Sequence, residues 1–256
     1  MSLTLRNQVR IVSIAVILLW FLSHALFVGV RNFLEGWEFS TLLLAIVIGI
    51  AVANLLARRT VSLYRTAVAR EDLPVAKRQY QMIQNFWKRR GSETIKTYGI
   101  NLLILEGNYR EAIEKLQTLD IKRIGKKWAP VVTTQIAWCL TQLGDPAKAL
   151  ELVHPLEHQL ESMGPDSGCY GHLVLGVAHF HLGESNEAVR HLEKANSTTS
   201  PSRKSTVLFY LGESYAALGN AGGARLAYQH AHEALPTGRF GITATERIQQ
   251  GEKTLS

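Results

Sequence analysis

The sequence predicts an all-α protein, in which a two-helix transmembrane hairpin is followed by an α-solenoid of about four to five helix-turn-helix repeats. Three observations predict this fold. Two apolar runs near the start of the 256-residue chain are each long enough to cross a bilayer. A glycine followed five residues later by an alanine then recurs four times. The net charge of +7 is concentrated in the stretch that joins these two parts.

The first apolar run covers residues 11–30, and the second covers residues 39–57. A helix rises about 1.5 Å per residue, so each run spans a hydrocarbon core of about 30 Å. The connector between the runs is long enough only for a tight return. Residues 1–58 are therefore expected to form an N-terminal segment and a transmembrane hairpin.

Basic residues flank the hairpin on the side of both chain ends. Arg6 and Arg10 precede the first run, and Arg58 and Arg59 follow the second, whereas the connector holds Arg31 against two glutamates. Cytoplasmic segments carry an excess of basic residues, so both termini and the repeat domain are expected in the cytoplasm, at a bacterial inner membrane. A cleaved signal peptide ending near residue 25 is the alternative, and it would leave the second run as the anchor.

Residues 59–91 are expected to form a basic, degenerate first repeat that continues directly from the second span, because no helix breaker separates them. Residues 58–90 contain nine basic and two acidic residues, which account for the whole net charge of +7. Each basic residue near a bilayer surface gains about 1 kcal/mol from anionic lipids. Membrane lipid, and not nucleic acid, is therefore the expected contact of a basic collar formed by Arg58, Arg59, Arg65, Lys88, Arg89 and Arg90.

Residues 92–237 are expected to hold four further repeats. Their glycines are 37, 39 and 36 residues apart, at Gly107, Gly144, Gly183 and Gly219. Each glycine can end a helix in the left-handed conformation, and each following alanine lies where two helix axes approach closely. Apolar residues recur at helical spacing around them, so each unit reads as a helix-turn-helix. In the degenerate unit Glu71 stands in place of the glycine.

This pattern resembles the tetratricopeptide repeat (TPR) family. The last unit carries the most family positions, namely Leu211, Gly212, Tyr215, Gly219, Ala224, Tyr228, Ala231 and Pro236. The third unit carries Gly176, Gly183, Ala188, Leu192 and Ala195, whereas the first two match at fewer positions. No unit has the family's early tryptophan. Glycine spacings above the family's period of about 34 residues imply longer segments between repeats.

The resemblance implies stacked helix pairs with a concave groove, lined by the first helix of each pair, that binds a protein or peptide partner. The positions carried over are Tyr98, Asn101, Gln135, Trp138, Tyr170, Val174, Val177, Phe180, Phe209, Tyr210 and Glu213. This aromatic, apolar and neutral-polar lining suits an apolar segment of a partner. Alternatively, the aromatic residues pack inside the array or against the capping helix and tail expected in residues 238–256, which could also fold into the groove.

The expected function is a non-enzymatic scaffold or adaptor at the membrane, with an assembly factor as one form of that role. The alternative is a regulatory subunit of a membrane enzyme complex that acts through the hairpin. Two-span anchors leading into TPR-like helices resemble bacterial membrane proteins associated with late haem biosynthesis, and envelope biosynthesis is a second setting. No phosphate loop, nucleophile elbow or zinc-protease motif is present, so no catalytic, cofactor or metal residue is expected. The paired histidines, His154 with His158, His179 with His181 and His230 with His232, are expected to be solvated or capping. The oligomeric state stays open.

Overall fold

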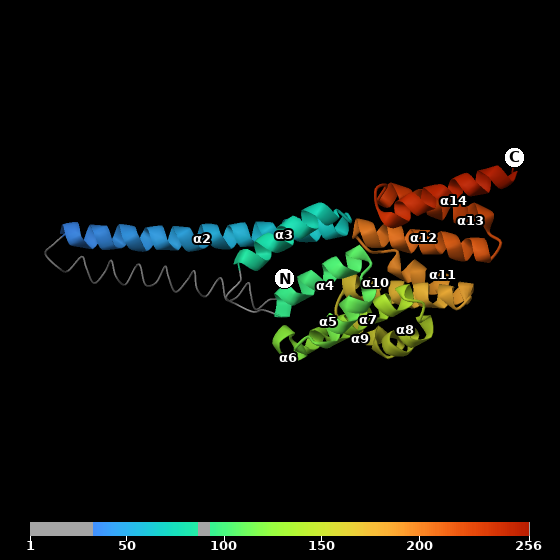
Figure 1. Ribbon diagram of the computed structural model, residues 1–256, viewed down its shortest axis with the longest axis horizontal. Helices are drawn as coiled ribbons and strands as arrows, with labels where there is room; N and C mark the ends of the chain where they lie inside the picture. Colours follow the sequence, from blue (N-terminus) through green and yellow to red (C-terminus); the bar gives the residue numbers. More distant parts are fainter. Residues whose placement is uncertain (1–32, 87–92, 256) are drawn as a thin grey trace. The chain divides into compact units, whose positions relative to one another are not determined.

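The computed structural model describes residues 33–86 and 93–255. Every regular element in these residues is helical, and they contain no β-strand (Figure 1). The chain divides into two compact units, Met1–Thr60 and Val61–Ser256. The predicted all-α class is confirmed for the described residues.

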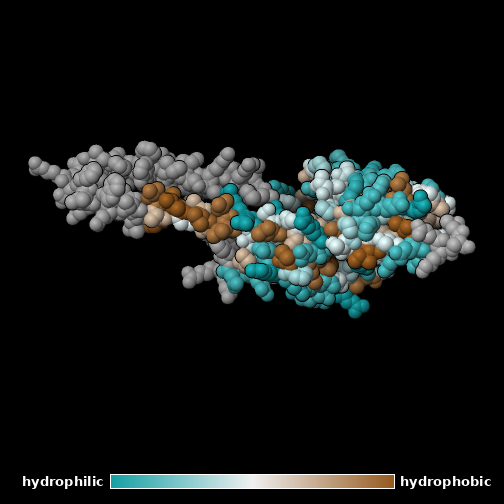
Figure 2. Space-filling view, turned by 90° about the horizontal axis from the view of Figure 1, so that it is seen from above, coloured by the Kyte–Doolittle hydropathy of each residue, from teal (hydrophilic) through white to brown (hydrophobic). Residues whose placement is uncertain are grey.

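Helix α2, Phe33–Ala69, contains the second predicted membrane run, residues 39–57. Its part from Leu43 to Ala69 is long and apolar enough to cross a membrane, and only 6% of its apolar 18-residue window is buried. Figure 2 shows this run of hydrophobic residues, whose exposed members are Leu44, Ile46, Ile48, Ile50, Val52, Leu55 and Leu56. It is the one helix of this kind within residues 33–86 and 93–255. The first predicted run, residues 11–30, lies outside the described residues, so the hairpin stays a prediction.

The unit Val61–Ser256 begins with the end of α2 and with α3, Leu73–Phe86. Successive helix pairs follow and make up most of the unit. In each pair the two helices pack against each other, and α11 packs in turn against α12 (Figure 1). The pairs are α4 Glu93–Glu106 with α5 Tyr109–Gln117, α7 Ala129–Gln142 with α8 Pro146–Val153, α10 Pro165–His181 with α11 Ser185–Ala195, and α12 Pro201–Ala217 with α13 Ala221–Ala234.

A left-handed residue ends the first helix of every pair. The four repeat glycines have φ between +75° and +87°, where a side chain would be strained. Glu71, in the turn between α2 and α3, has φ of +54° and is the one residue other than glycine with positive φ in the described residues. The glutamate that replaces glycine in the sequence pattern therefore adopts the conformation of the glycine that it replaces.

Small residues lie where the helices of a pair touch. The repeat alanines Ala112, Ala149 and Ala188 have no exposed surface. A Cβ added at Gly176 would lie 2.6 Å from the Leu192 side chain, and one added at Gly212 would lie 2.5 Å from the Tyr228 ring. The axes approach so closely because these positions have little or no side chain.

Two hydrophobic clusters stabilise the unit. The larger runs through the pairs from α4 to α13 and on to the last helix, α14, Arg239–Leu255, and includes Ile100, Leu116, Leu175 and Leu192. The smaller lies among the end of α2, α3 and α4, around Tyr64, Ala67, Ala76, Ile83 and Leu102. Tyr64 also donates a 2.6 Å hydrogen bond to the Tyr98 carbonyl, which ties the end of α2 to α4. The degenerate first unit therefore packs on the repeats that follow it.

Short helices fill the long connections that the glycine spacings imply. Helix α6, Ile121–Ile124, and the 3₁₀ turn η1, Lys126–Trp128, join the first pair to the second. The turn η2, His154–Leu156, and helix α9, Glu157–Ser162, join the second pair to the third. The capping helix expected in residues 238–256 is α14, Arg239–Leu255, which packs on α12 and α13.

Candidate functional site

The predicted groove residues lie on the first helices of the pairs, but five of them are buried. Val174 and Val177 have no exposed surface, and Trp138, Phe209 and Tyr210 are 9%, 7% and 6% exposed. These five side chains belong to the larger core cluster. The residues that keep partly exposed side chains are Tyr98, Asn101, Gln135, Tyr170, Phe180 and Glu213.

Two of the polar groove residues are bound to each other. The Gln135 side-chain amide donates a 2.9 Å hydrogen bond to the Asn101 carbonyl oxygen, which links α7 to α4. Tyr98 packs against Tyr64, with their ring centroids 5.1 Å apart. The predicted groove positions of the first two pairs are thus uncharged residues that are partly satisfied by their own contacts.

Helix α14 covers the end of the array. The centroid of the Phe240 ring lies 5.2 Å from that of Phe209 and 5.5 Å from that of Tyr210. Phe180 packs on Tyr210 and extends the same aromatic cluster to α10. Burial raises the pKa of the Tyr210 hydroxyl. Near the middle of α14, Arg247 makes a bidentate ion pair with Glu213, at 2.7 and 3.2 Å. The aromatic groove positions of α12 therefore pack against the terminal helix, which is the alternative that the sequence left open.

Glu71 ties the α2–α3 turn to two distant helices. Its carboxylate accepts hydrogen bonds from the Ser202 hydroxyl at 2.6 Å and from the Arg239 backbone N–H at 2.8 Å. The Arg239 guanidinium also donates to the Tyr109 hydroxyl at 3.1 Å. The start of α14 is thus bound to residues that lie up to 168 positions earlier in the chain.

The basic collar is described only in part. Arg58, Arg59 and Arg65 are exposed on α2. Lys88, Arg89 and Arg90 lie outside the described residues.

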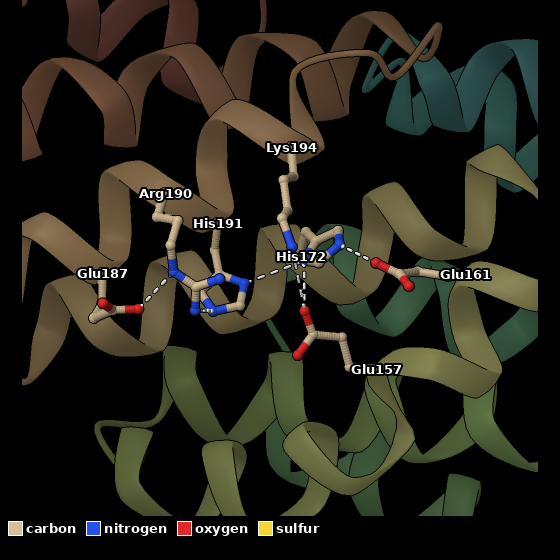
Figure 3. Close-up of polar contacts among 7 residues, drawn as sticks. All are labelled: Glu157, Glu161, His172, Glu187, Arg190, His191 and Lys194. Carbon is tan, nitrogen blue, oxygen red and sulfur yellow. Dashed lines mark hydrogen bonds and ion pairs between the residues drawn. The ribbon is translucent and has the colours of Figure 1, made fainter.

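A cluster of histidines and carboxylates that the sequence did not predict lies between α9, α10 and α11 (Figure 3). The Nδ1 atoms of His172 and His191 are 3.1 Å apart, and the Nε2 of His172 is 3.0 Å from Glu161. Glu157 Oε1 lies 3.6 Å from the Nδ1 of His172. Both imidazoles are buried, at 5% and 1% exposure.

Charged groups set the proton positions in this cluster. Arg190 lies 2.7 Å from the Nε2 of His191, and since a guanidinium only donates, His191 carries its proton on Nδ1. That proton points at the Nδ1 of His172, whose own proton is then on Nε2 and is donated to Glu161. Burial, with the charge of Arg190 as the next cause, lowers the pKa of His191 to about 3. Both rings are bonded in a chain that runs from Arg190 to Glu161.

The histidine pairs noted in the sequence lie elsewhere. His154, His158 and His230 are exposed. His179 pairs with Glu184 at 2.5 Å at the end of its helix, and His232 contacts Thr245 at 3.0 Å. The sequence does not reveal this cluster, because its histidines are 19 residues apart and on different helices. The repeat register packs α10 on α11, with Gly176 against Leu192, but it does not by itself predict that His172 meets His191.

Residues 170–194, which form most of α10 and α11 with the turn between them, match the family model of the tetratricopeptide repeat. This segment is the third predicted repeat, and it contains both histidines of the cluster. A search of the curated proteins gives no match to the chain.

Proposed function

We propose that this chain, a tetratricopeptide repeat protein, is a membrane-anchored scaffold or adaptor that binds a protein partner at the cytoplasmic face of a bacterial inner membrane. Repeats of this family generally bind proteins and generally lack enzymatic activity, and an assembly factor is one form of such a role. The observation that carries the membrane part of the proposal is α2, in which seven large apolar side chains between Leu44 and Leu56 are exposed.

The exposed apolar run of α2 favours a bilayer as its surroundings. Exposed contiguous apolar patches of this kind mark interaction or membrane sites, because leaving them in water is costly. Arg58 and Arg59 directly follow the apolar run and are exposed, as expected for residues at a headgroup layer. The first predicted run, residues 11–30, supplies the other span of the proposed anchor.

Membrane fractionation and proteolysis test the anchor and its orientation. Alkaline carbonate should leave the full chain in the membrane pellet. Protease should digest the repeats in inverted vesicles and spare them in intact spheroplasts, because the repeats are proposed to be cytoplasmic. Release by carbonate would refute the anchor, and digestion in spheroplasts would refute the orientation.

The partly exposed faces of α4, α7 and α10 are the proposed contact for the partner. Asn101 and Gln135 offer amide groups there, and Tyr170 and Phe180 offer aromatic surface. Such a lining suits an apolar or neutral-polar segment of a partner, with aromatic residues as anchors. The equivalent face of α12 is covered by α14.

Crosslinking from native membranes tests this surface. The variant is Asn101→Ala with Gln135→Ala, which removes both members of one hydrogen bond and so leaves neither amide without its partner. The control is Lys148→Ala with Arg225→Ala, two exposed residues on second helices. A partner captured by the wild type and the control, and lost with the first variant, supports the proposal. Equal capture by all three proteins would contradict it.

The alternative function is a regulatory subunit of a membrane enzyme complex, of the haem or envelope biosynthesis type, that acts through the transmembrane hairpin. The burial of five predicted groove residues favours it, since less of the repeat surface is open to a partner. Replacing residues 1–57 with an unrelated two-span anchor distinguishes the two functions. A scaffold keeps its partner after this exchange, whereas a subunit that acts through the hairpin loses it.

A further inference from the structure

Three side chains between α9, α10 and α11 direct potential ligand atoms at one point (Figure 3). The atoms are Glu157 Oε1 and the Nδ1 atoms of His172 and His191, and all lie within 4.8 Å of one another. The two nitrogens are 3.1 Å apart, and the carboxylate oxygen is 3.6 Å from the Nδ1 of His172. A tetrahedral zinc site with bonds of about 2.0–2.1 Å separates its ligand atoms by about 3.3 Å. Two of the three separations, 3.1 and 3.6 Å, are therefore close to that of such a site.

We propose that Glu157, His172 and His191 form a binding site for a divalent transition-metal ion of the zinc class. Two imidazoles and a carboxylate are a donor set that this ion accepts, with its fourth position left to water. The inference is independent of the proposed scaffold function, because it concerns an ion held within the repeats and not a partner outside them.

The surroundings of His172 are those of a metal ligand. Histidine ligands almost always donate their other ring N–H to a carboxylate or carbonyl, which fixes the ring and its tautomer. The Nε2 of His172 is 3.0 Å from Glu161 Oε1, so its Nδ1 lone pair points into the cluster. Helix α9 supplies both Glu157 and Glu161, and α9 is part of the segment inserted between the second and third pairs.

His191 is the ligand that must change on binding. In the ion-free cluster its proton is on Nδ1, because Arg190 donates to Nε2 at 2.7 Å. For Nδ1 to bind an ion, this proton moves to Nε2 and the guanidinium withdraws. Arg190 is 51% exposed and already pairs with Glu187 at 2.7 Å, so it has room to leave. The ion then replaces the hydrogen bond that joins the two imidazoles.

Two positive charges compete with the ion. Besides Arg190, the Lys194 ammonium lies 3.7 Å from Glu157 Oε1, and it is 47% exposed. Removal of Arg190 should therefore tighten metal binding, although Arg190 is not a ligand. A purely structural hydrogen-bond chain has no reason to show that response.

Cobalt titration of the full chain tests the site. The protein is purified in detergent without a polyhistidine tag and is stripped of metal with EDTA. Co²⁺ should bind with one ion per chain and give the visible absorption of a tetrahedral site, and Zn²⁺ should displace it. Glu157→Gln should weaken binding at least about tenfold through loss of one ligand. Arg190→Gln should tighten it about tenfold through loss of one nearby positive charge.

The matched controls separate the site from other histidines and from misfolding. His230→Gln changes an exposed histidine outside the cluster and should bind Co²⁺ as the wild type does. Glu157→Gln keeps the bond between the two imidazoles, and circular dichroism should show unchanged helix content. Absence of stoichiometric tetrahedral absorption in the wild type would overturn the proposal. Equal affinity of the wild type and Glu157→Gln, or no tightening with Arg190→Gln, would also overturn it.

Discussion

At the scale of single residues, the fold depends on a glycine where two helices touch, on a residue with positive φ and on a buried carboxylate. Gly212 has no Cβ where the Tyr228 ring crosses α12, and Glu71 holds a φ of +54° in the turn after α2. Glu93, at the start of α4, is 5% exposed and bonds to Lys96 at 2.8 Å and to the backbone N–H of Asp120 at 3.1 Å. Each of these residues can be tested by a single substitution.

Gly212→Ala should lower the free energy of unfolding by about 1–3 kcal/mol, because the added methyl group would lie 2.5 Å from the Tyr228 ring. Thermal melts of the full chain in detergent measure the loss. Gly222→Ala is the matched control in α13, where the nearest atom to the new methyl is 4.0 Å away. The control should be neutral or more stable, since alanine favours helix. Equal losses at both positions would contradict the close approach.

Glu93→Gln should reduce stability at pH 7 by about 1.5–3 kcal/mol, the scale of hydrogen bonds to a charged group. The bond from Lys96, ahead of the bond from Asp120, lowers the pKa of Glu93 below its ordinary value of 4.5. Its ionised form therefore adds stability above pH 4.5, and this is lost as the pH falls through the lower folded-state pKa. Urea unfolding of both proteins across this range should show the difference narrowing on acidification. A difference independent of pH would contradict this account.

At the scale of elements, the sequence predicted the helix pairs and their turns well. Gly107, Gly144, Gly183 and Gly219 each end a helix as expected, because turn chemistry is local and depends on the residue at the turn. The burial of the groove positions was harder to predict. Whether Phe209 and Tyr210 face a partner or their own chain depends on where α14 packs, and a repeat pattern carries no information on that.

Phe240→Ala should destabilise the array by about 3 kcal/mol, because it removes a ring that is 8% exposed and packed on Phe209 and Tyr210. Hydrogen exchange should then rise in α12, whose face loses its cover. Ile242→Ala, a neighbour that is 50% exposed, serves as the control and should leave both stability and exchange near the wild-type values. Unchanged exchange in α12 with Phe240→Ala would show that α14 does not protect that face.

At the scale of the whole molecule, the unit Val61–Ser256 departs from a simple stack in which each repeat touches only its neighbours. The turn at Glu71 bonds to Ser202 and Arg239, and Arg239 bonds to Tyr109. The sequence identified Glu71 as the replacement for a glycine but not its partners, since contacts over 131 and 168 residues leave no local pattern. The cluster of His172 and His191 was also missed, because its residues lie 19 positions apart on different helices and share no local pattern.

Glu71→Gln should therefore act far from the substituted residue. Loss of the charge weakens the bonds to Ser202 and Arg239, and hydrogen exchange should rise in the first turns of α12 and α14. Exchange mass spectrometry on the full chain measures this effect. Asp72→Asn, at the exposed neighbouring residue, is the control and should leave both distant turns unchanged. A response confined to α2 and α3 would contradict the long-range tie.

The bond between Glu71 and Arg239 also has a consequence for biosynthesis. Its partners are 168 residues apart, and ribosomes add about 5–20 residues per second, so Glu71 emerges on the order of ten seconds before Arg239. During that interval all of α2 has been synthesised, whereas Arg239, whose backbone N–H donates to Glu71, has not. Insertion of the proposed anchor can thus precede completion of the array, because the bond between Glu71 and Arg239 forms only after α14 has been synthesised.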